Sequence, residues 1–176
     1  MAEKATVYKL QLTLSDMDRQ VYGDYNLTLA LHPSETIERM MVRILAFCYR
    51  AAENLSFTKG LSSVEEPDLW LKHDNGTLLE WIEVGQPTAE RLKKASNQSQ
   101  AVYLFSYGRG WDVWWKNNSS TIKAMPKVTS YFFEADELKA LCDLADRTMK
   151  LTVTITENLT YVSNETANLV VSRVEL

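Results

Sequence analysis

The stretch that decides the fold runs from residue 66 to residue 84 and reads Glu66-Pro67-Asp68-Leu69-Trp70-Leu71-Lys72-His73-Asp74-Asn75-Gly76-Thr77-Leu78-Leu79-Glu80-Trp81-Ile82-Glu83-Val84. Two strand-like runs, 68–72 and 77–85, flank an Asn-Gly pair, which is a strong turn signal. We expect an antiparallel hairpin. Asp68 lies near the start of its first strand and Glu83 near the end of its second, so the pairing brings both carboxylates to the same end.

Two neighbouring carboxylates repel each other, and the repulsion raises the pKa of one of them unless a cation relieves it. Oxygen-only ligation suits Mg²⁺ or Mn²⁺. The spacing of Asp68 and Glu83 therefore indicates a divalent-metal site. The alternative is that both acids are solvated strand ends without a chemical role.

The region before this hairpin predicts two strands and a helix. Residues 6–15 and 21–32 alternate apolar and polar side chains, which indicates a second antiparallel hairpin. Ser34 is a candidate helix cap, and the helix is expected to run to about Glu53 because apolar residues recur from Ile37 to Ala52 at helical spacing.

The region after the hairpin continues as mixed α/β. Pro87 opens a polar helix, and Gly108 and Gly110 precede an aromatic-rich run that reads as a strand. The expected elements are a helix at 88–96, strands at 101–107, 111–115 and 129–133, a helix at 134–148, and terminal strands around 151–155, 161 and 169–174. The pattern predicts one central mixed sheet with flanking helices and additional N- and C-terminal strands.

Length and composition indicate a single soluble domain spanning residues 1–176, with an apolar fraction of 45% and a charged fraction of 24%. No apolar run approaches the roughly 18 residues of a membrane span, so we expect no membrane association. Cys48 and Cys142 read as buried free thiols, and no export signal precedes the first strand, which favours the cytoplasm. The net charge of −4 argues against a protein that coats nucleic acid without specificity, because the overall field repels a phosphate backbone. Any nucleic-acid contact must therefore be local.

Several strings in the chain carry a resemblance to a known family. Pro67-Asp68 followed by Trp81-Ile82-Glu83-Val84 resembles the Pro-Asp and (Asp/Glu)-x-Lys motif of the PD-(D/E)XK nuclease superfamily. More closely, nearly the whole chain is similar to the YaeQ family. That similarity rests on His32-Pro33-Ser34-Glu35, Glu38-Arg39-Met40-Met41-Val42-Arg43, Lys59-Gly60-Leu61-Ser62, Glu66-Pro67-Asp68-Leu69-Trp70, Trp81-Ile82-Glu83, Gly85-Gln86-Pro87, Arg91, Lys94 and Asp112-Val113-Trp114-Trp115.

The resemblance implies a compact variation on the nuclease-like fold with a polar cleft. In the superfamily the acids that match Asp68 and Glu83 hold the metal, and a glutamate from the first core helix joins them. A lysine two residues after the second acid acts on the attacking water. Here that position is Gly85, which can neither stabilise developing charge nor lower the pKa of water.

Other cations near this position are candidates to replace the missing lysine. Arg91 and Lys94 are three residues apart and share a helix face, so we expect them to reach the space beside Gly85, with Lys94 as the first candidate. Gln86 is expected on the opposite strand face. The alternative for Arg91 and Lys94 is a solvated helix face with a Glu90–Lys94 pair.

The first helix offers the third acid. Glu38 lies at the margin of its apolar stripe, whereas Glu35 lies nearly opposite that stripe and is expected to face water. Arg39 and Arg43 either pair with Glu35 or reach a phosphate.

Two functions therefore compete. The first is a phosphodiesterase or nuclease-like enzyme in which Asp68 and Glu83 hold Mg²⁺ or Mn²⁺, Glu38 assists, and Lys94 or Arg91 positions phosphate or water. The second is a non-catalytic nuclease-like fold that binds nucleic acid, a small phosphorylated ligand or a protein. The sequence assigns no oligomeric state and decides neither substrate nor catalysis.

Overall fold

A computed structural model describes residues 3–176. The chain divides into two compact units. Unit one comprises the residues up to Ala51 together with Glu134–Arg173, and unit two comprises Ala52–Phe133 together with Val174–Leu176. The expectation of a single domain stays a prediction.

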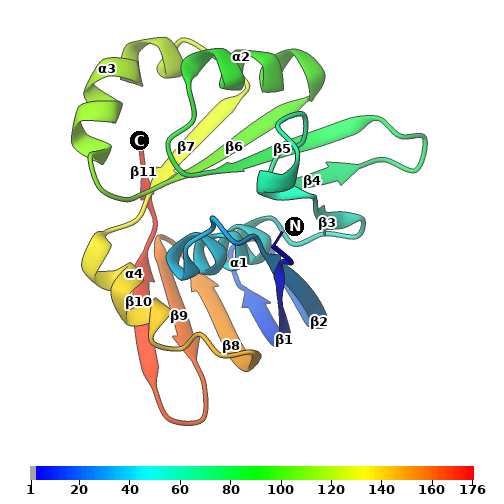
Figure 1. Cartoon of the computed structure of the whole chain (residues 1–176), viewed down its shortest axis with the longest axis vertical. Coiled ribbons are helices and arrows are strands. Elements are labelled where there is room, and N and C mark those ends of the chain that lie inside the picture. Colours follow the sequence, from blue (N-terminus) through cyan, green and yellow to red (C-terminus); the bar gives the residue numbers. More distant parts are fainter. Residues whose placement is uncertain (1–2) are drawn as a thin grey trace. The chain divides into compact units, whose positions relative to one another are not determined.

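Unit one contains a five-stranded mixed sheet in the order β10-β9-β8-β1-β2. Parallel pairing joins β1 to β8, and the other neighbours are antiparallel. The elements, labelled in Figure 1, are β1 (Thr6–Asp16), β2 (Val21–Leu31), α1 (Ile37–Arg50), α4 (Ala135–Cys142), β8 (Thr148–Thr156), β9 (Leu159–Ser163) and β10 (Asn168–Ser172).

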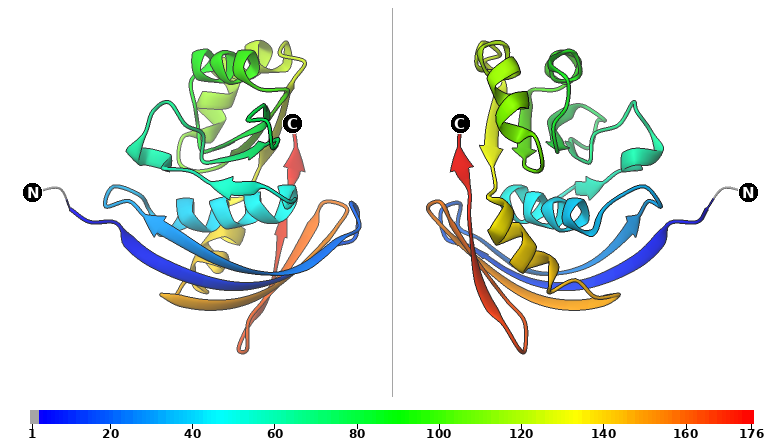
Figure 2. Two further views of the ribbon diagram at one scale, coloured as in Figure 1. Left: turned by 90° about the vertical axis from the view of Figure 1, so that its right-hand side faces the viewer. Right: turned by 60° about the vertical axis from the view of Figure 1, so that its left-hand side comes forward.

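The predicted N-terminal hairpin is confirmed, since β1 pairs with β2 from Thr6↔Leu31 to Asp16↔Val21. Leucines at alternate β1 positions are buried while the residues between them are exposed, as a sheet with one covered face requires. The long strands curve beneath α1 (Figure 2), which contacts both β1 and β2. Burial of that face fixes the register of the strands.

Helix α1 begins later than the sequence predicts. Thr36 is the N-cap, and its hydroxyl accepts a hydrogen bond from the Arg39 amide. Ser34 instead contacts the ring nitrogen of His32, with 2.7 Å between Oγ and Nδ1. At the other end Arg19 donates to the carbonyl oxygens of Tyr49 and Ala51, each at 2.8 Å. A side chain from the β1–β2 turn therefore satisfies carbonyls that the end of the helix leaves free.

Unit two contains a six-stranded mixed sheet in the order β11-β7-β6-β5-β4-β3. Strands β5, β6 and β7 are parallel, and the outer pairings are antiparallel. The elements are β3 (Leu55–Phe57), a 3₁₀ turn (Gly60–Ser62), β4 (Leu69–Lys72), β5 (Leu78–Val84), α2 (Ala89–Gln98), β6 (Ala101–Ser106), α3 (Trp111–Lys123), β7 (Val128–Phe132) and β11 (Val174–Glu175).

The core of unit two lies between its sheet and the helices α2 and α3, which cover one face of the parallel strands (Figure 1). Its fully buried members come from β5, α2, β6 and α3, and they are Trp81, Leu92, Ala95, Val102, Leu104 and Ile122. The decisive hairpin is confirmed, because β4 and β5 are antiparallel with Leu69 opposite Ile82. Gly76 supplies the positive φ of 86° in its turn.

Three expectations are wrong. The mixed α and β content is confirmed, but the chain forms two mixed sheets rather than one central sheet, because β1 pairs with β8 instead of joining the strands around β5. The run Trp111–Trp115 is the start of helix α3 and not a strand. The helix expected at 134–148 ends at Cys142.

Candidate functional site

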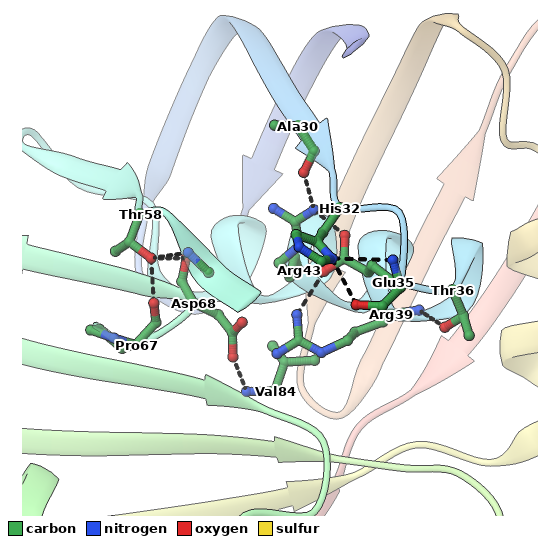
Figure 3. A network of polar contacts seen from close by, with 12 residues as sticks. Ala30, His32, Glu35, Thr36, Arg39, Arg43, Thr58, Pro67, Asp68 and Val84 are labelled. Carbon is green, nitrogen blue, oxygen red and sulfur yellow. Dashed lines mark hydrogen bonds and ion pairs between the residues drawn. The ribbon is translucent and has the colours of Figure 1, made fainter. Parts of the chain in front are cut away.

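The predicted acid pair lies on the β4–β5 hairpin of unit two. The Asp68 amide donates to the Ile82 carbonyl at 3.0 Å, which places the residue directly before β4 and opposite the end of β5. Its carboxylate oxygen Oδ2 accepts from the Val84 amide at 2.8 Å (Figure 3). Asp68 is 3% exposed and Glu83 is 4% exposed. The alternative of two solvated strand ends is therefore wrong.

Glu83 is held by two donors on one oxygen. The Trp81 ring nitrogen donates to Glu83 Oε1 at 2.8 Å, and Arg91 Nε donates to the same oxygen at 2.9 Å. The pKa of Glu83 is raised, because burial disfavours the charged form and the negative charge of Asp68 adds to that effect, while the Arg91 hydrogen bond opposes it. The two acids are thus electrostatically linked, as the spacing predicts.

Arg91 also holds the segment that precedes Asp68. Its Nη1 donates to the Val64 carbonyl at 2.7 Å, and its Nη2 donates to the Glu66 carbonyl at 2.8 Å. The guanidinium carbon lies 5.7 Å from the centre of the Trp81 ring. One side chain on the first turn of α2 therefore joins a buried carboxylate to a loop. Sequence reasoning missed this link, since nothing in the local pattern pairs α2 with residues 64–66.

Lys94, the first candidate for the missing lysine, has a different partner in the structure. Its amine lies 2.6 Å from the Glu65 carboxylate, and both side chains are exposed. The pKa of Glu65 is lowered by the hydrogen bond and the charge of Lys94. The role of Lys94 toward water or phosphate stays a prediction.

Gly85 has a backbone that explains why no lysine stands there. Its φ is 111°, which side chains of L-residues rarely adopt, and its amide donates to the Phe105 carbonyl at 2.9 Å. A Cβ at this position would meet no atom within 4 Å, so the restriction comes from the backbone and not from crowding. Gln86 donates from Nε2 to the carbonyls of Tyr107 and Arg109 at 2.9 and 3.1 Å, and so holds the loop between β6 and α3.

The remaining predicted residues lie in unit one. Glu35 is buried with 3% of its side chain exposed, which corrects the expectation that it faces water. It pairs with Arg39 at 2.7 Å and with Arg43 at 2.5 Å, and Arg43 also donates to the Ala30 carbonyl (Figure 3). The expected ion pairs are confirmed, and burial of Glu35 follows because both guanidinium groups neutralise it.

Glu38 follows the N-cap of α1 and is partly buried, as its place at the stripe margin predicts. Burial raises its pKa. It belongs to unit one, whereas Asp68 and Glu83 belong to unit two. Its part in a shared metal site stays a prediction.

Other metal-ligating and thiol side chains add no second site within residues 3–176. No group of three or more His, Cys, Asp or Glu side chains in that range is arranged to hold a metal ion. Cys48 and Cys142 are free thiols, Cys48 buried and Cys142 only partly so. No helix in the same range is long and apolar enough to cross a membrane.

The two mixed sheets and their helices make the chain a mixed α and β protein, and a buried acid pair lies on its β4–β5 hairpin. A family model described as YaeQ protein matches residues 1–173, and the chain belongs to that family. It is 41% identical over 173 residues to the uncharacterized protein YaeQ of Escherichia coli K12, covering 98% of this chain and 96% of the relative. It is 42% identical over 170 residues to that of Salmonella typhi, covering 96% and 94%.

Solved structures agree over the same length. The YaeQ protein of Xanthomonas axonopodis pv. citri superposes with a TM-score of 0.93 at 35% identity and 97% coverage of both chains. The YaeQ protein of Pseudomonas syringae superposes with a TM-score of 0.93 at 39% identity, covering 98% of this chain and 96% of the other. The curated relatives are described as uncharacterized, so the function must be argued from the site.

Proposed function

We propose that Asp68 and Glu83 form the cation site of a divalent-metal-dependent phosphodiesterase on a nuclease-like core. The observation that carries the proposal is the burial of two carboxylates at the facing ends of β4 and β5, where the charge of one helps to raise the pKa of the other. Burying two like charges costs free energy that a cation between them would offset. Carboxylate oxygens favour Mg²⁺ or Mn²⁺.

The contacts of the two acids support this proposal. Both hydrogen bonds to Glu83 converge on Oε1, which leaves Oε2 as the oxygen proposed to face the ion. The Val84 amide and the Trp81 ring nitrogen orient the two carboxylates, as groups around metal ligands commonly do. A bound cation would supply Lewis acidity and a water of lowered pKa. Lys94 is proposed as the group that positions phosphate.

Calorimetry with Mn²⁺ tests the cation site. We expect one binding event in the unaltered protein and its loss in Asp68→Asn and Glu83→Gln. Asp74→Asn is the matched control, because Asp74 lies in the same hairpin but at its exposed turn. Equal binding by all four proteins would place the ion elsewhere, and no binding by any of them or by Arg91→Met would remove the proposal.

Hydrolysis is tested separately on a small phosphodiester, single- and double-stranded DNA, and RNA. The proposal expects Mn²⁺-dependent cleavage that Asp68→Asn abolishes and Asp74→Asn retains. Cleavage that survives in Asp68→Asn would come from a contaminant or from another site.

A second candidate function is binding of nucleic acid, a phosphorylated ligand or a protein without hydrolysis. Two observations favour it. Gly85 stands in a backbone conformation unsuited to the usual lysine, and Arg91 already neutralises Glu83. This alternative expects Mn²⁺ binding or ligand binding that depends on Asp68, with no cleavage of any substrate.

A further inference from the structure

The segment Thr58–Pro67 forms a closed loop directly before Asp68. The Thr58 amide donates to the Asp68 carbonyl at 3.2 Å, so the two ends of the loop meet. Inside it the Lys59 amide donates to Glu66 Oε2 at 2.9 Å, and Gly60 to Ser62 form one 3₁₀ turn. A compact loop with joined ends can move as a unit.

Charged side chains of α2 hold this loop. Arg91 binds the carbonyls of Val64 and Glu66, and Lys94 binds the Glu65 carboxylate. The apolar side chains of the loop contribute little burial, since Leu61 is 43% exposed and Val64 is 76% exposed. A loop with few buried apolar contacts belongs to the part of a protein that opens most easily.

The same guanidinium binds the loop and Glu83. Arg91 reaches Glu83 Oε1 through Nε and Nη2, both at 2.9 Å, while Nη1 and Nη2 hold the loop carbonyls. A planar fork with fixed donors keeps all of these bonds only in one position. Any event that moves the guanidinium from Glu83 therefore also weakens its hold on residues 64–66.

We infer that Arg91 is a latch: a divalent cation at Glu83 competes with its guanidinium, and displacement of the guanidinium releases the loop 58–67. This inference rests on the proposed cation site. Two cations beside one carboxylate repel each other, so binding of the ion and closure of the loop oppose each other. By linkage, the effect is reciprocal: a bound cation weakens closure of the loop by the same factor by which loop closure weakens cation binding.

Hydrogen exchange followed by mass spectrometry tests the latch, because the exchange rate of the peptide covering residues 58–67 reports how often this loop opens. Saturating Mn²⁺ is expected to speed exchange of this peptide by about tenfold in the unaltered protein, as loss of one or two charge-assisted hydrogen bonds would. Arg91→Met is expected to show the faster exchange without Mn²⁺ and to bind Mn²⁺ about tenfold more tightly. Lys93→Met, an exposed change on the same helix, is the control and is expected to leave both measurements unchanged.

Arg91→Lys provides a second variant in case the methionine protein folds poorly. A lysine keeps the positive charge beside Glu83 but lacks the fork that spans both loop carbonyls. It is expected to speed loop exchange while Mn²⁺ affinity changes by less than in Arg91→Met.

The outcomes separate the two proposals. If Mn²⁺ binds in an Asp68-dependent way but exchange in residues 58–67 stays constant, the latch is wrong and the cation site stands. If neither the unaltered protein nor Arg91→Met binds Mn²⁺, both are wrong. If only Arg91→Met binds, the competition is supported and the unaltered protein is held in its closed form.

Discussion

Gly85 makes the clearest residue-scale prediction. Its φ of 111° disfavours any side chain, whereas a Cβ there meets no atom within 4 Å. We expect Gly85→Ala and Gly85→Lys to lower the free energy of unfolding by the same amount, about 1 to 3 kcal/mol, because the cost lies in the backbone. Urea unfolding of the two variants measures this loss of free energy of unfolding.

Gly76 offers a comparison for this experiment, since it too has a positive φ, of 86°, and open space where a Cβ would lie. Gly76→Ala is expected to cost a similar amount. A much larger loss in Gly85→Lys than in Gly85→Ala would show that the side chain itself clashes, and would contradict a purely backbone origin of the cost.

The position of a single side chain was predictable only where its spacing along one hairpin or one helix determines it. The hairpin brings Asp68 and Glu83 together because β4 and β5 are antiparallel, with Leu69 opposite Ile82. Burial of Glu35 could not be predicted from helix periodicity, since it depends on two guanidinium groups that neutralise the carboxylate. The link from Arg91 to Val64 and Glu66 depends on tertiary placement of α2.

At the scale of single elements, the end of α1 depends on a side chain from outside the helix. Arg19 donates to the Tyr49 and Ala51 carbonyls and lies 3.5 Å from Asp16. We expect Arg19→Met to lower the free energy of unfolding by about 2 kcal/mol, because buried carbonyls lose charged donors. Chemical denaturation followed by circular dichroism measures the change.

Lys150→Met is a suitable control for that measurement, because Lys150 is exposed on β8 in the same unit. It is expected to stay within about 0.5 kcal/mol of the unaltered protein, as surface substitutions usually do. Equal stability of Arg19→Met and Lys150→Met would show that water replaces the arginine without cost.

The elements themselves were predictable to different degrees. Helix α1 carries a long apolar stripe, so its presence was predicted even though its cap was misplaced by two residues, from Ser34 to Thr36. Helix α3 was mistaken for a strand because tryptophan favours strands in general. The spacing of Trp111, Trp115 and Ile122 follows one helix face, and Trp111 stacks on Trp115 at 6.0 Å, so a helical signal was present.

At the scale of the whole molecule, the division into two units gives a direct test of the single-domain prediction. All five tryptophans lie between residues 70 and 115, within unit two, so tryptophan fluorescence reports on that unit. Far-ultraviolet circular dichroism reports on both units. We expect the two unfolding curves to coincide. Unit one is built from two chain segments, and its β1–β8 pairing joins strands that lie on either side of the inserted residues 52–133 in the sequence.

A difference between the midpoints of the two curves would contradict the single-domain prediction and assign separate stabilities to the units. A Tyr22→Trp variant sharpens the measurement, since it adds a fluorescent probe at an exposed position of β2 in unit one. In a cooperative molecule its fluorescence follows the same curve.

The presence of two sheets could not be predicted from the sequence. Each strand run was visible by its alternation, but residues 52–133 of unit two lie between the parallel partners β1 and β8 along the chain. Alternation reveals which face of a strand is buried and not which distant strand lies beside it. The error of one central sheet arose from this missing long-range information.

The left-handed backbone of Gly85 also bears on how this lineage can evolve. Replacing the glycine by lysine delivers the side chain, but it leaves the path of the chain after β5 unchanged. Placing an amine there in a relaxed conformation requires a further change that reshapes this turn. A lysine that enters this position by a single substitution therefore carries the backbone cost with it, and a lysine free of that cost takes at least a second substitution.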